Sequence, residues 1–356
     1  MSVSRPLAWS LIVLTLLGSS LARQLYDFIP LWNPLPWPIR SPLYALLVIL
    51  FVVFLGTSAR PSRHRSPAHG RVPLAALAPL LIAFLYEKLL SVTLYDALLD
   101  HAVQIRLIRN HLDSWIHIII GTGMIMAVLL LVPLMRGVRY SAFITSARLR
   151  SGFYLHFLAL LGAYAILAGL AVIFARGEIR PILVFPVGTA AVMLLLGQGL
   201  RAMAEEFYYR GLLQRELQAL MGLLGVTRRR SGQALAIAMI SLGFGMEHFR
   251  FGADLAGAYR GFAYAVAAGF LFGYLLVLTG NIFFCGLVHA TNNFIIAGIM
   301  PRVASTDGTL SLPNEPILFI YLISVFLIVF IVASIPHRNL KKALLPDLES
   351  WPVSLN

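Results

Sequence analysis

The chain of 356 residues is strongly apolar, with 59% hydrophobic and only 12% charged residues. A soluble globular domain carries about 25% charged residues, so this chain has too few polar side chains to cover a surface that faces water. The net charge of +13 lies in short basic runs between apolar segments. Such runs are typical of membrane topology signals and not of nucleic-acid binding. We therefore expect an all-α polytopic membrane helix bundle whose partner is the lipid bilayer, with no nucleic-acid partner.

About ten segments are long and apolar enough to cross a membrane. They lie at 7–22, 42–58, 73–91, 114–135, 153–175, 181–204, 233–249, 261–279, 281–299 and 316–335. The first could be mistaken for a signal peptide, but an uncleaved helix is favoured because many further spans follow. The segment 181–220 is too long for one straight crossing, and Gly197 and Gly199 are the predicted points for a kink.

The distribution of arginine predicts the topology. The linkers 59–72, 136–152 and 220–232 and the tail from 336 are basic, and they share one side if the N-terminus is cytoplasmic. We expect an integral, multi-pass protein of a bacterial inner or plasma membrane, with both termini in the cytoplasm. Three regions follow along the chain: an N-terminal accessory transmembrane region of about four spans, a core and a basic cytoplasmic tail, at 1–150, 151–335 and 336–356.

Three polar clusters interrupt the last apolar half of the chain. Each charged side chain in a membrane span costs roughly 2.5 to 3.5 kcal/mol, so a sequence that places several there is typically using them. The clusters comprise Glu205, Glu206 and Arg210 in AEEFYYRG, Phe244, Glu247 and His248 in FGMEH, and His289 and Asn293 in HATNN. These residues are the candidates for function.

Spacing within the clusters predicts different roles for neighbouring residues. Glu206 and Arg210 are four residues apart, so they share a helix face and form a structural ion pair. Glu205 points about 100° away and is expected to have no cationic partner. The same spacing puts the ring of Phe244 one turn before His248, where it limits the orientation of the imidazole.

His289 and Asn293 present two hydrogen-bonding side chains on one helix face. Glu247, which adjoins His248, has two open interpretations: it lines a wet cavity, or it is a supporting partner of the site. Cys285, the single cysteine, has no partner for an intramolecular disulfide and is interpreted as a packing residue.

The ordered set EExxxR, FxxxH and HxxxN at 205–210, 244–248 and 289–293 resembles the CAAX-protease and bacteriocin-processing (CPBP) family of intramembrane proteases. That family includes the enzyme that trims prenylated CAAX proteins in eukaryotes. Arg210-Gly211-Leu212 after the first motif and Thr279-Gly280-Asn281 before the third agree with it. The resemblance covers about 181–300 and implies a membrane-associated protein or peptide as substrate.

By this resemblance, Glu205 and His248 hold and activate a water, while His289 and Asn293 form the oxyanion site. Glu205, His248 and His289 are also an adequate ligand set for zinc with an open position. We favour a mechanism without a cofactor, because no two ligands have a chelate spacing such as His-x-x-x-His. Zinc stays the alternative.

Two other classes of function compete with the protease. One is a catalytically silent maturation, immunity or scaffold protein that keeps the polar clusters for structure. The other is a transporter or proton relay, which is disfavoured because the chain shows no internal duplication. As substrates, a peptide leader or a C-terminal sorting anchor suits a bacterial chain better than a prenylated tail.

Overall fold

The computed structural model describes residues 2–26, 71–74, 76–77, 80–81, 162, 189–226, 228–249, 255–279, 282–294, 303–304 and 310–311. Helices make up 87% of this part, in agreement with the predicted all-α class. The helices are α1 (Arg5–Tyr26), α8 (Thr189–Glu206), the π-helix η5 (Phe207–Leu213), α9 (Gln214–Leu220), α10 (Arg229–His248), α11 (Leu255–Thr279) and α12 (Ile282–Phe294). The expected spans 42–58, 114–135 and 316–335, most of 73–91 and of 153–175, and the tail 336–356 lie outside the described residues.

Short strands accompany the helices. These strands were not predicted from the sequence. Strand β1 (Ser2–Ser4) pairs antiparallel with β2 (Arg71–Pro73), and Val3 lies opposite Val72. A second pair joins β3 (Val303–Ala304) to β4 (Leu310–Ser311). Helix α1 begins directly after β1, where the Ser4 hydroxyl oxygen accepts a hydrogen bond from the backbone N–H of Leu7 at 3.4 Å. A serine at this position caps backbone groups that the first helical turn leaves without partners.

Helix α8, η5 and α9 form one uninterrupted helical run from Thr189 to Leu220. The α-helical part passes through Gly197 and Gly199 without a break, and the kink predicted at these glycines stays a prediction. The irregularity lies further on, at the π-helix that follows Glu206. Glycine lowers helix stability but does not by itself interrupt the hydrogen-bond ladder.

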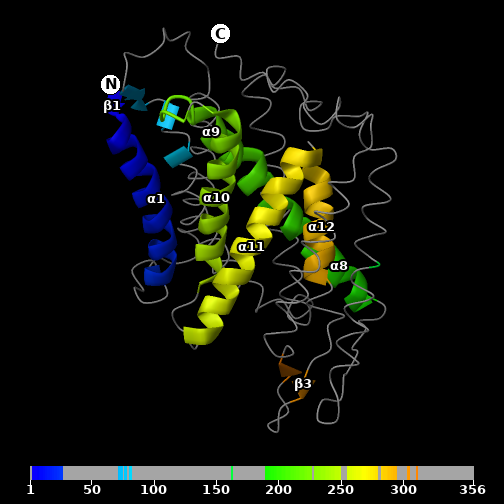
Figure 1. The fold of residues 1–356 in the computed structure, drawn as a ribbon. Coiled ribbons are helices and arrows are strands. Elements are labelled where there is room, and N and C mark those ends of the chain that lie inside the picture. Colours follow the sequence, from blue (N-terminus) through cyan, green and yellow to red (C-terminus); the bar gives the residue numbers. More distant parts are fainter. Residues whose placement is uncertain are drawn as a thin grey trace, which may run out of the picture.

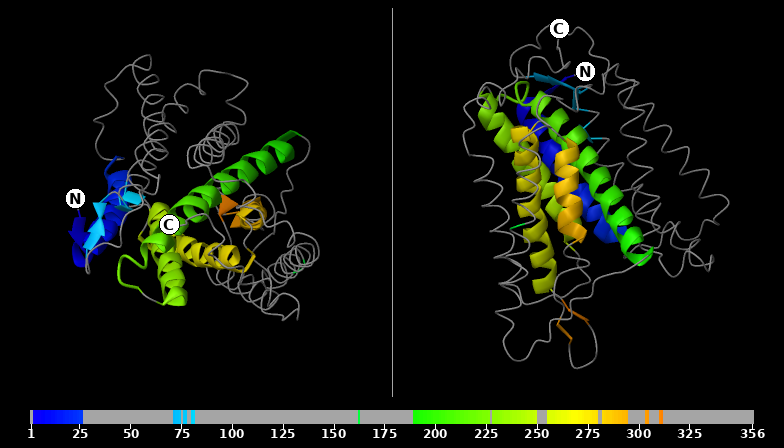
Figure 2. Two further views of the ribbon diagram at one scale, coloured as in Figure 1. Left: turned by 90° about the horizontal axis from the view of Figure 1, so that it is seen from above. Right: turned by 90° about the vertical axis from the view of Figure 1, so that its right-hand side faces the viewer.

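Close helix contacts hold the described core together, with α10 against α11 and α12 against α8 (Figure 1). A Cβ atom at Gly269 of α11 would lie 2.9 Å from the Cα atom of Ser241 on α10, so only glycine allows this approach. A Cβ atom at Gly286 of α12 would overlap Met203 on α8. Seen from above, α8 crosses the group while α1 lies at its edge (Figure 2). These contacts bring together the three helices that carry the sequence clusters.

The N-terminal segment is fastened to the turn between α9 and α10. Nε of Arg5 donates to the carbonyl of Leu223 at 3.0 Å, and the indole N–H of Trp9 donates to that of Leu224 at 3.2 Å. Gly225 ends this turn with a φ of 91°, a left-handed conformation that favours glycine. Because β1 also pairs with β2, the N-terminus, residues 71–73 and the start of linker 220–232 lie at one end of the molecule.

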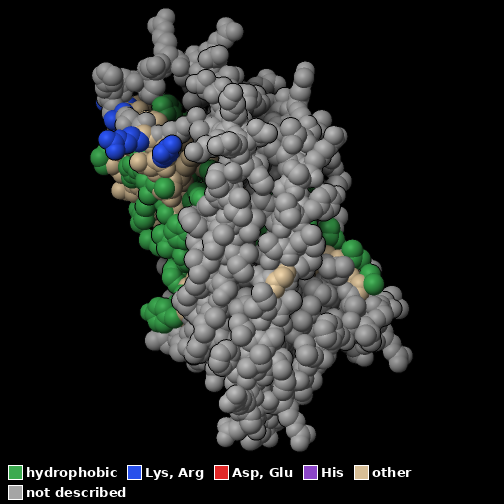
Figure 3. Space-filling model, turned by 45° about the vertical axis from the view of Figure 1, so that its right-hand side comes forward, with side chains coloured by type: hydrophobic (Ala, Val, Ile, Leu, Met, Phe, Trp, Pro, Cys, Tyr) green, Lys and Arg blue, Asp and Glu red, His purple; other side chains and the backbone are tan. Residues whose placement is uncertain are grey.

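This end of the molecule is basic, and the surface next to it is apolar. Figure 3 shows arginine side chains gathered above a band of hydrophobic side chains. Among the described residues, the exposed arginines are Arg71, Arg228 and Arg230, and the large exposed apolar side chains include Leu7, Leu14 and Leu17 of α1. The side of a membrane that the basic segments face stays a prediction. None of the helices in the described ranges is both long enough and apolar enough to cross a membrane.

Candidate active site

The first motif lies where α8 changes into η5. Glu205 and Glu206 are the last two residues of α8, and Arg210 lies inside η5. At the end of η5 the backbone N–H of Gln214 donates to the carbonyl of Tyr209, five residues earlier. Such π-turns are rare and occur frequently at functional sites, because the extra residue changes the direction in which side chains leave the helix. The local backbone thus departs from an α-helix directly beside both glutamates.

Glu206 and Arg210 form a fully buried ion pair. Nη1 of Arg210 lies 3.2 Å from Oε1 of Glu206, and neither side chain is exposed. Nη2 of Arg210 donates to the carbonyl of Gly269 at 3.2 Å. The guanidinium carbon also lies 4.9 Å from the ring centre of Phe244, a cation–π contact. The predicted pairing of Glu206 with Arg210 is confirmed, and further contacts offset the cost of burying both charges.

His289 connects the first and third motifs. Its Nδ1 atom lies 2.9 Å from Oε1 of Glu206, and its Nε2 atom lies 3.6 Å from Oε2 of Glu205. An ionised carboxylate only accepts hydrogen bonds, so the proton on Nδ1 is donated to Glu206. The imidazole is stacked on the ring of Phe272, with centroids 4.6 Å apart. Glu206 and Phe272 together fix the ring so that Nε2 faces Glu205.

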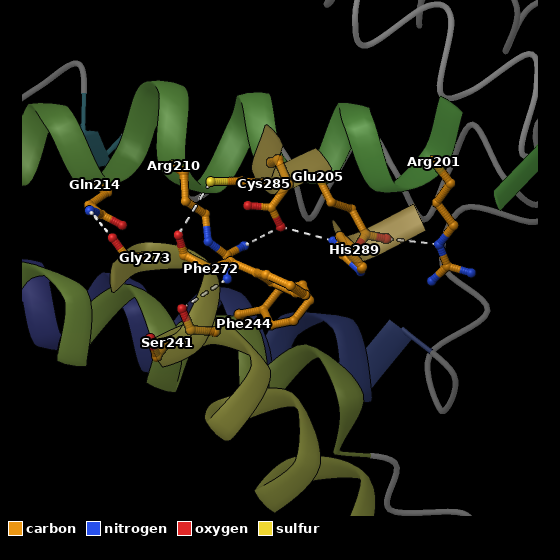
Figure 4. Close-up of polar contacts among 12 residues, drawn as sticks. Arg201, Glu205, Arg210, Gln214, Ser241, Phe244, Phe272, Gly273, Cys285 and His289 are labelled. Atoms are coloured by element: carbon orange, nitrogen blue, oxygen red, sulfur yellow. Dashed lines mark hydrogen bonds and ion pairs between the residues drawn. The ribbon is translucent and has the colours of Figure 1, made fainter. Parts of the chain in front are cut away.

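Glu205 has a cationic partner that the sequence analysis did not foresee. Nε of Arg201, one turn earlier on α8, donates to Oε1 of Glu205 at 2.8 Å. The expectation that Glu205 is unpaired is therefore wrong. The side chain of Arg201 is 41% exposed and that of Glu205 is 18% exposed, so this pair lies at the rim of the buried network (Figure 4). The sequence did contain the signal, since Arg201 and Glu205 are four residues apart.

His248 is the last residue of α10, and Phe244 orients it as predicted. Nδ1 of His248 lies 2.9 Å from the carbonyl oxygen of Phe244, so this nitrogen is the donor and the lone pair resides on Nε2. The two rings have centroids 4.7 Å apart. The Phe244 ring also meets that of His289 edge to face at 6.1 Å. One aromatic ring therefore contacts both histidines.

The two asparagines of the third motif differ in their surroundings. Asn292 is buried, and its amide nitrogen donates to the hydroxyl of Tyr264 on α11 at 2.7 Å. Asn293, the predicted oxyanion residue, is half-buried one turn after His289. Asn292 and Tyr264 were missed because their contact joins two helices and neither residue belongs to a spaced motif. Glu247 is half-buried on α10 beside His248.

Within the described residues, no three histidine, cysteine, aspartate or glutamate side chains are arranged to hold a metal ion. Two of the candidate zinc ligands, Glu205 and His289, are instead engaged with cations or carboxylates of neighbouring residues. The mechanism without a cofactor, and zinc as its alternative, stay predictions.

Comparison with known protein families gives a match over part of the chain. The family described as "Type II CAAX prenyl endopeptidase Rce1-like" matches residues 186–295, a range that contains all three motifs. No curated protein and no solved structure matches the chain. The matched range begins near the start of α8 and ends just after α12.

Proposed function

We propose, on the premise that residues 186–295 form a Rce1-like domain of the CPBP family, that the protein is an intramembrane endopeptidase of a membrane-associated protein or peptide. The family consists of membrane-integral peptide hydrolases that act on membrane-associated proteins. The observation that carries the proposal is the position of His289, which contacts Glu206 at 2.9 Å and Glu205 at 3.6 Å. A histidine between two acids, with an aromatic ring fixing its plane, suits a site for proton transfer and charge stabilisation.

Glu205 and His248 activate water in this proposal. A water oxygen attacks the carbonyl carbon of the scissile peptide bond while the Glu205 carboxylate takes a proton from it. His248 accepts a hydrogen bond from the water through Nε2, because its Nδ1 is committed to the carbonyl of Phe244. The carbon–nitrogen bond then breaks, and the proton held by Glu205 passes to the leaving amine. Atoms and charges balance without a cofactor.

His289 and Asn293 stabilise the oxygen on which negative charge develops. The Asn293 amide supplies one donor. His289 supplies a second donor when its Nε2 carries a proton. Glu206 acts through His289 by holding Nδ1, so it is a positioning residue as well as the partner of Arg210.

The first experiment identifies substrates by terminal-peptide mass spectrometry of membranes from cells that carry wild-type protein or Glu205→Gln. We expect new termini in wild-type membranes that disappear with Glu205→Gln. Glu216→Gln, in the first turn of α9, is the matched control and should retain them. Identical termini in wild-type and Glu205→Gln membranes would favour the catalytically silent alternative.

A second experiment addresses the metal. If water is activated as proposed, purified protein treated with a strong chelator keeps its rate on a verified substrate. Loss of activity on chelation that returns on addition of zinc would instead make Glu205, His248 and His289 metal ligands.

A further inference from the structure

The pair formed by Arg201 and Glu205 is placed where it opposes the proposed role of Glu205. The guanidinium Nε lies 2.8 Å from Oε1 of the carboxylate. A cation at this distance stabilises the ionised carboxylate, and a stabilised carboxylate accepts a proton from water less readily. In the arrangement that the structure shows, Glu205 is therefore a poor general base. Catalysis by Glu205 requires that this contact be weakened when substrate is bound.

The two ion pairs at the end of α8 differ in burial, and only the partly exposed pair can separate at a low cost in free energy. The Glu206–Arg210 pair is wholly buried, whereas the Arg201 side chain is 41% exposed and that of Glu205 18%. Opening a buried pair leaves charges without solvent and is strongly unfavourable. A half-exposed pair contributes little net stability, so another anion can replace one of its members. Arginine is suited to such an exchange because its planar fork binds carboxylates through two parallel hydrogen bonds.

We propose that Arg201 is a specificity-determining residue that binds an anionic group of the substrate, and that this exchange releases Glu205 to activate water. The inference rests on the proposed function. An extended substrate spans about 3.3 Å per residue. An anionic group bound to the Arg201 guanidinium therefore lies about two or three substrate residues from the bond that Glu205 attacks. The substrate class is thus a peptide with a carboxylate close to the scissile bond. The carboxylate is either the C-terminus or an aspartate or glutamate side chain.

The test uses the full-length protein in phosphatidylcholine vesicles and a peptide that spans a cleavage site identified by mass spectrometry. Four forms of the peptide are compared: unchanged, with a C-terminal amide, with acidic side chains near the site replaced by their amides, and with both changes. For the wild type we expect kcat/KM to fall roughly tenfold to a hundredfold when the recognised anion is removed, the effect of one charge-assisted hydrogen bond. The form that causes the fall identifies the source of the anion.

Arg201→Gln is expected to cleave the anionic and neutral peptides at similar rates, and the neutral peptide faster than the wild type does. Arg201→Lys, which keeps the charge but loses the fork, should keep a reduced preference. Arg228→Gln, at an exposed arginine of the basic end, is the matched control and should keep the wild-type preference. If Arg201→Gln does not fold, the preference of Arg201→Lys decides.

The inference is overturned if the wild type cleaves all four peptides equally well, or if the substituted Arg201 variants keep the full wild-type preference. In either case, the proposed function is still supported if the Glu205→Gln protein does not cleave the peptide. Undiminished cleavage by Glu205→Gln would overturn the proposed function itself, so the two failures are distinguishable.

Discussion

At the residue scale, the two adjacent glutamates at the end of α8 have opposite environments. Glu206 is enclosed with Arg210 and His289, and it lies opposite a guanidinium that contacts three aromatic rings. Glu205 lies at the rim with Arg201. Burial decides the energetics of each pair, because a desolvated charge that loses its partner cannot be compensated by water. The two glutamates should therefore respond differently to loss of their arginines.

Arg210→Ala should lower the free energy of unfolding by roughly 3 to 5 kcal/mol, because it leaves the buried charge of Glu206 without its cation. Arg201→Ala should change stability by no more than about 1 kcal/mol, as for other exposed pairs. Thermal melting of both variants in detergent provides the comparison. Equal melting temperatures for Arg210→Ala and the wild type would contradict the role of the buried pair.

Asn293→Ala should lose about 2.7 to 4 kcal/mol of transition-state stabilisation, seen in kcat with little change in KM, as for the removal of one oxyanion donor. Asn292→Ala loses a hydrogen bond to Tyr264 and should act mainly on stability. Steady-state kinetics beside melting curves separate the two effects. A larger fall in kcat for Asn292→Ala than for Asn293→Ala would show that Asn292, and not Asn293, supplies the oxyanion donor.

Contacts between residues one helical turn apart could be predicted from the sequence, whereas contacts between distant residues could not. The pairs Glu206–Arg210 and Phe244–His248 follow from helix periodicity, and the structure contains both. The hydrogen bond between His289 and Glu206 joins residues 83 apart in the chain, so its geometry depends on how α12 packs on α8. The Arg201–Glu205 pair has the same i, i+4 spacing, so helix periodicity also indicates this pair.

At the scale of elements, the π-helix η5 and the close contacts at glycine position the site. Apolar length predicted the existence of α1, α10, α11 and α12, although α10 and α11 begin several residues before the expected spans. Their starts include polar residues that an apolar-length criterion leaves out. The π-helix had no signal in composition or spacing, because it reflects a choice between hydrogen-bond partners one residue apart. Tertiary packing on α10, α11 and α12 surrounds η5.

Gly269→Val should destabilise the protein by about 1 to 3 kcal/mol, because the new side chain forces α11 away from Ser241 on α10. Activity should fall as well, since the carbonyl of Gly269 accepts from Arg210. Gly199→Ala is the control, because nothing lies within 4 Å of a Cβ atom there. It should be neutral or stabilising by about 0.5 to 1 kcal/mol. A valine at Gly269 without effect on melting would contradict the close packing of α10 and α11.

At the scale of the whole molecule, the N-terminal helix packs against the region that matches the family model. Ala8 and Ile12 of α1 are buried in the same apolar cluster as Leu217 and Ile240 of that region. The contacts of Arg5 and Trp9 add polar attachment at the turn after α9. The predicted accessory region thus contributes α1 to the core around α9 and α10. Sequence reasoning could not place it there, because these contacts join residues more than two hundred positions apart.

Single cysteines introduced at Ser2 and Ser231 should be labelled from the same side of the membrane, because both residues are exposed at the basic end. The positive-inside rule predicts that a membrane-impermeant thiol reagent reaches them only after the cells are permeabilised. The native Cys285 is buried and should contribute little background. Labelling of one position from outside and the other from inside would contradict the shared end, and labelling of both from outside would invert the topology.

The catalytic role of Glu205 is tested by the cleavage rate of purified Glu205→Gln protein on a verified peptide. The substitution keeps the shape of the side chain but removes the base, so we expect the rate to fall by at least about a hundredfold. The melting temperature should stay close to that of the wild type, because Glu205 lies at the rim of the network. A folded Glu205→Gln protein that cleaves the peptide at the wild-type rate would contradict the account.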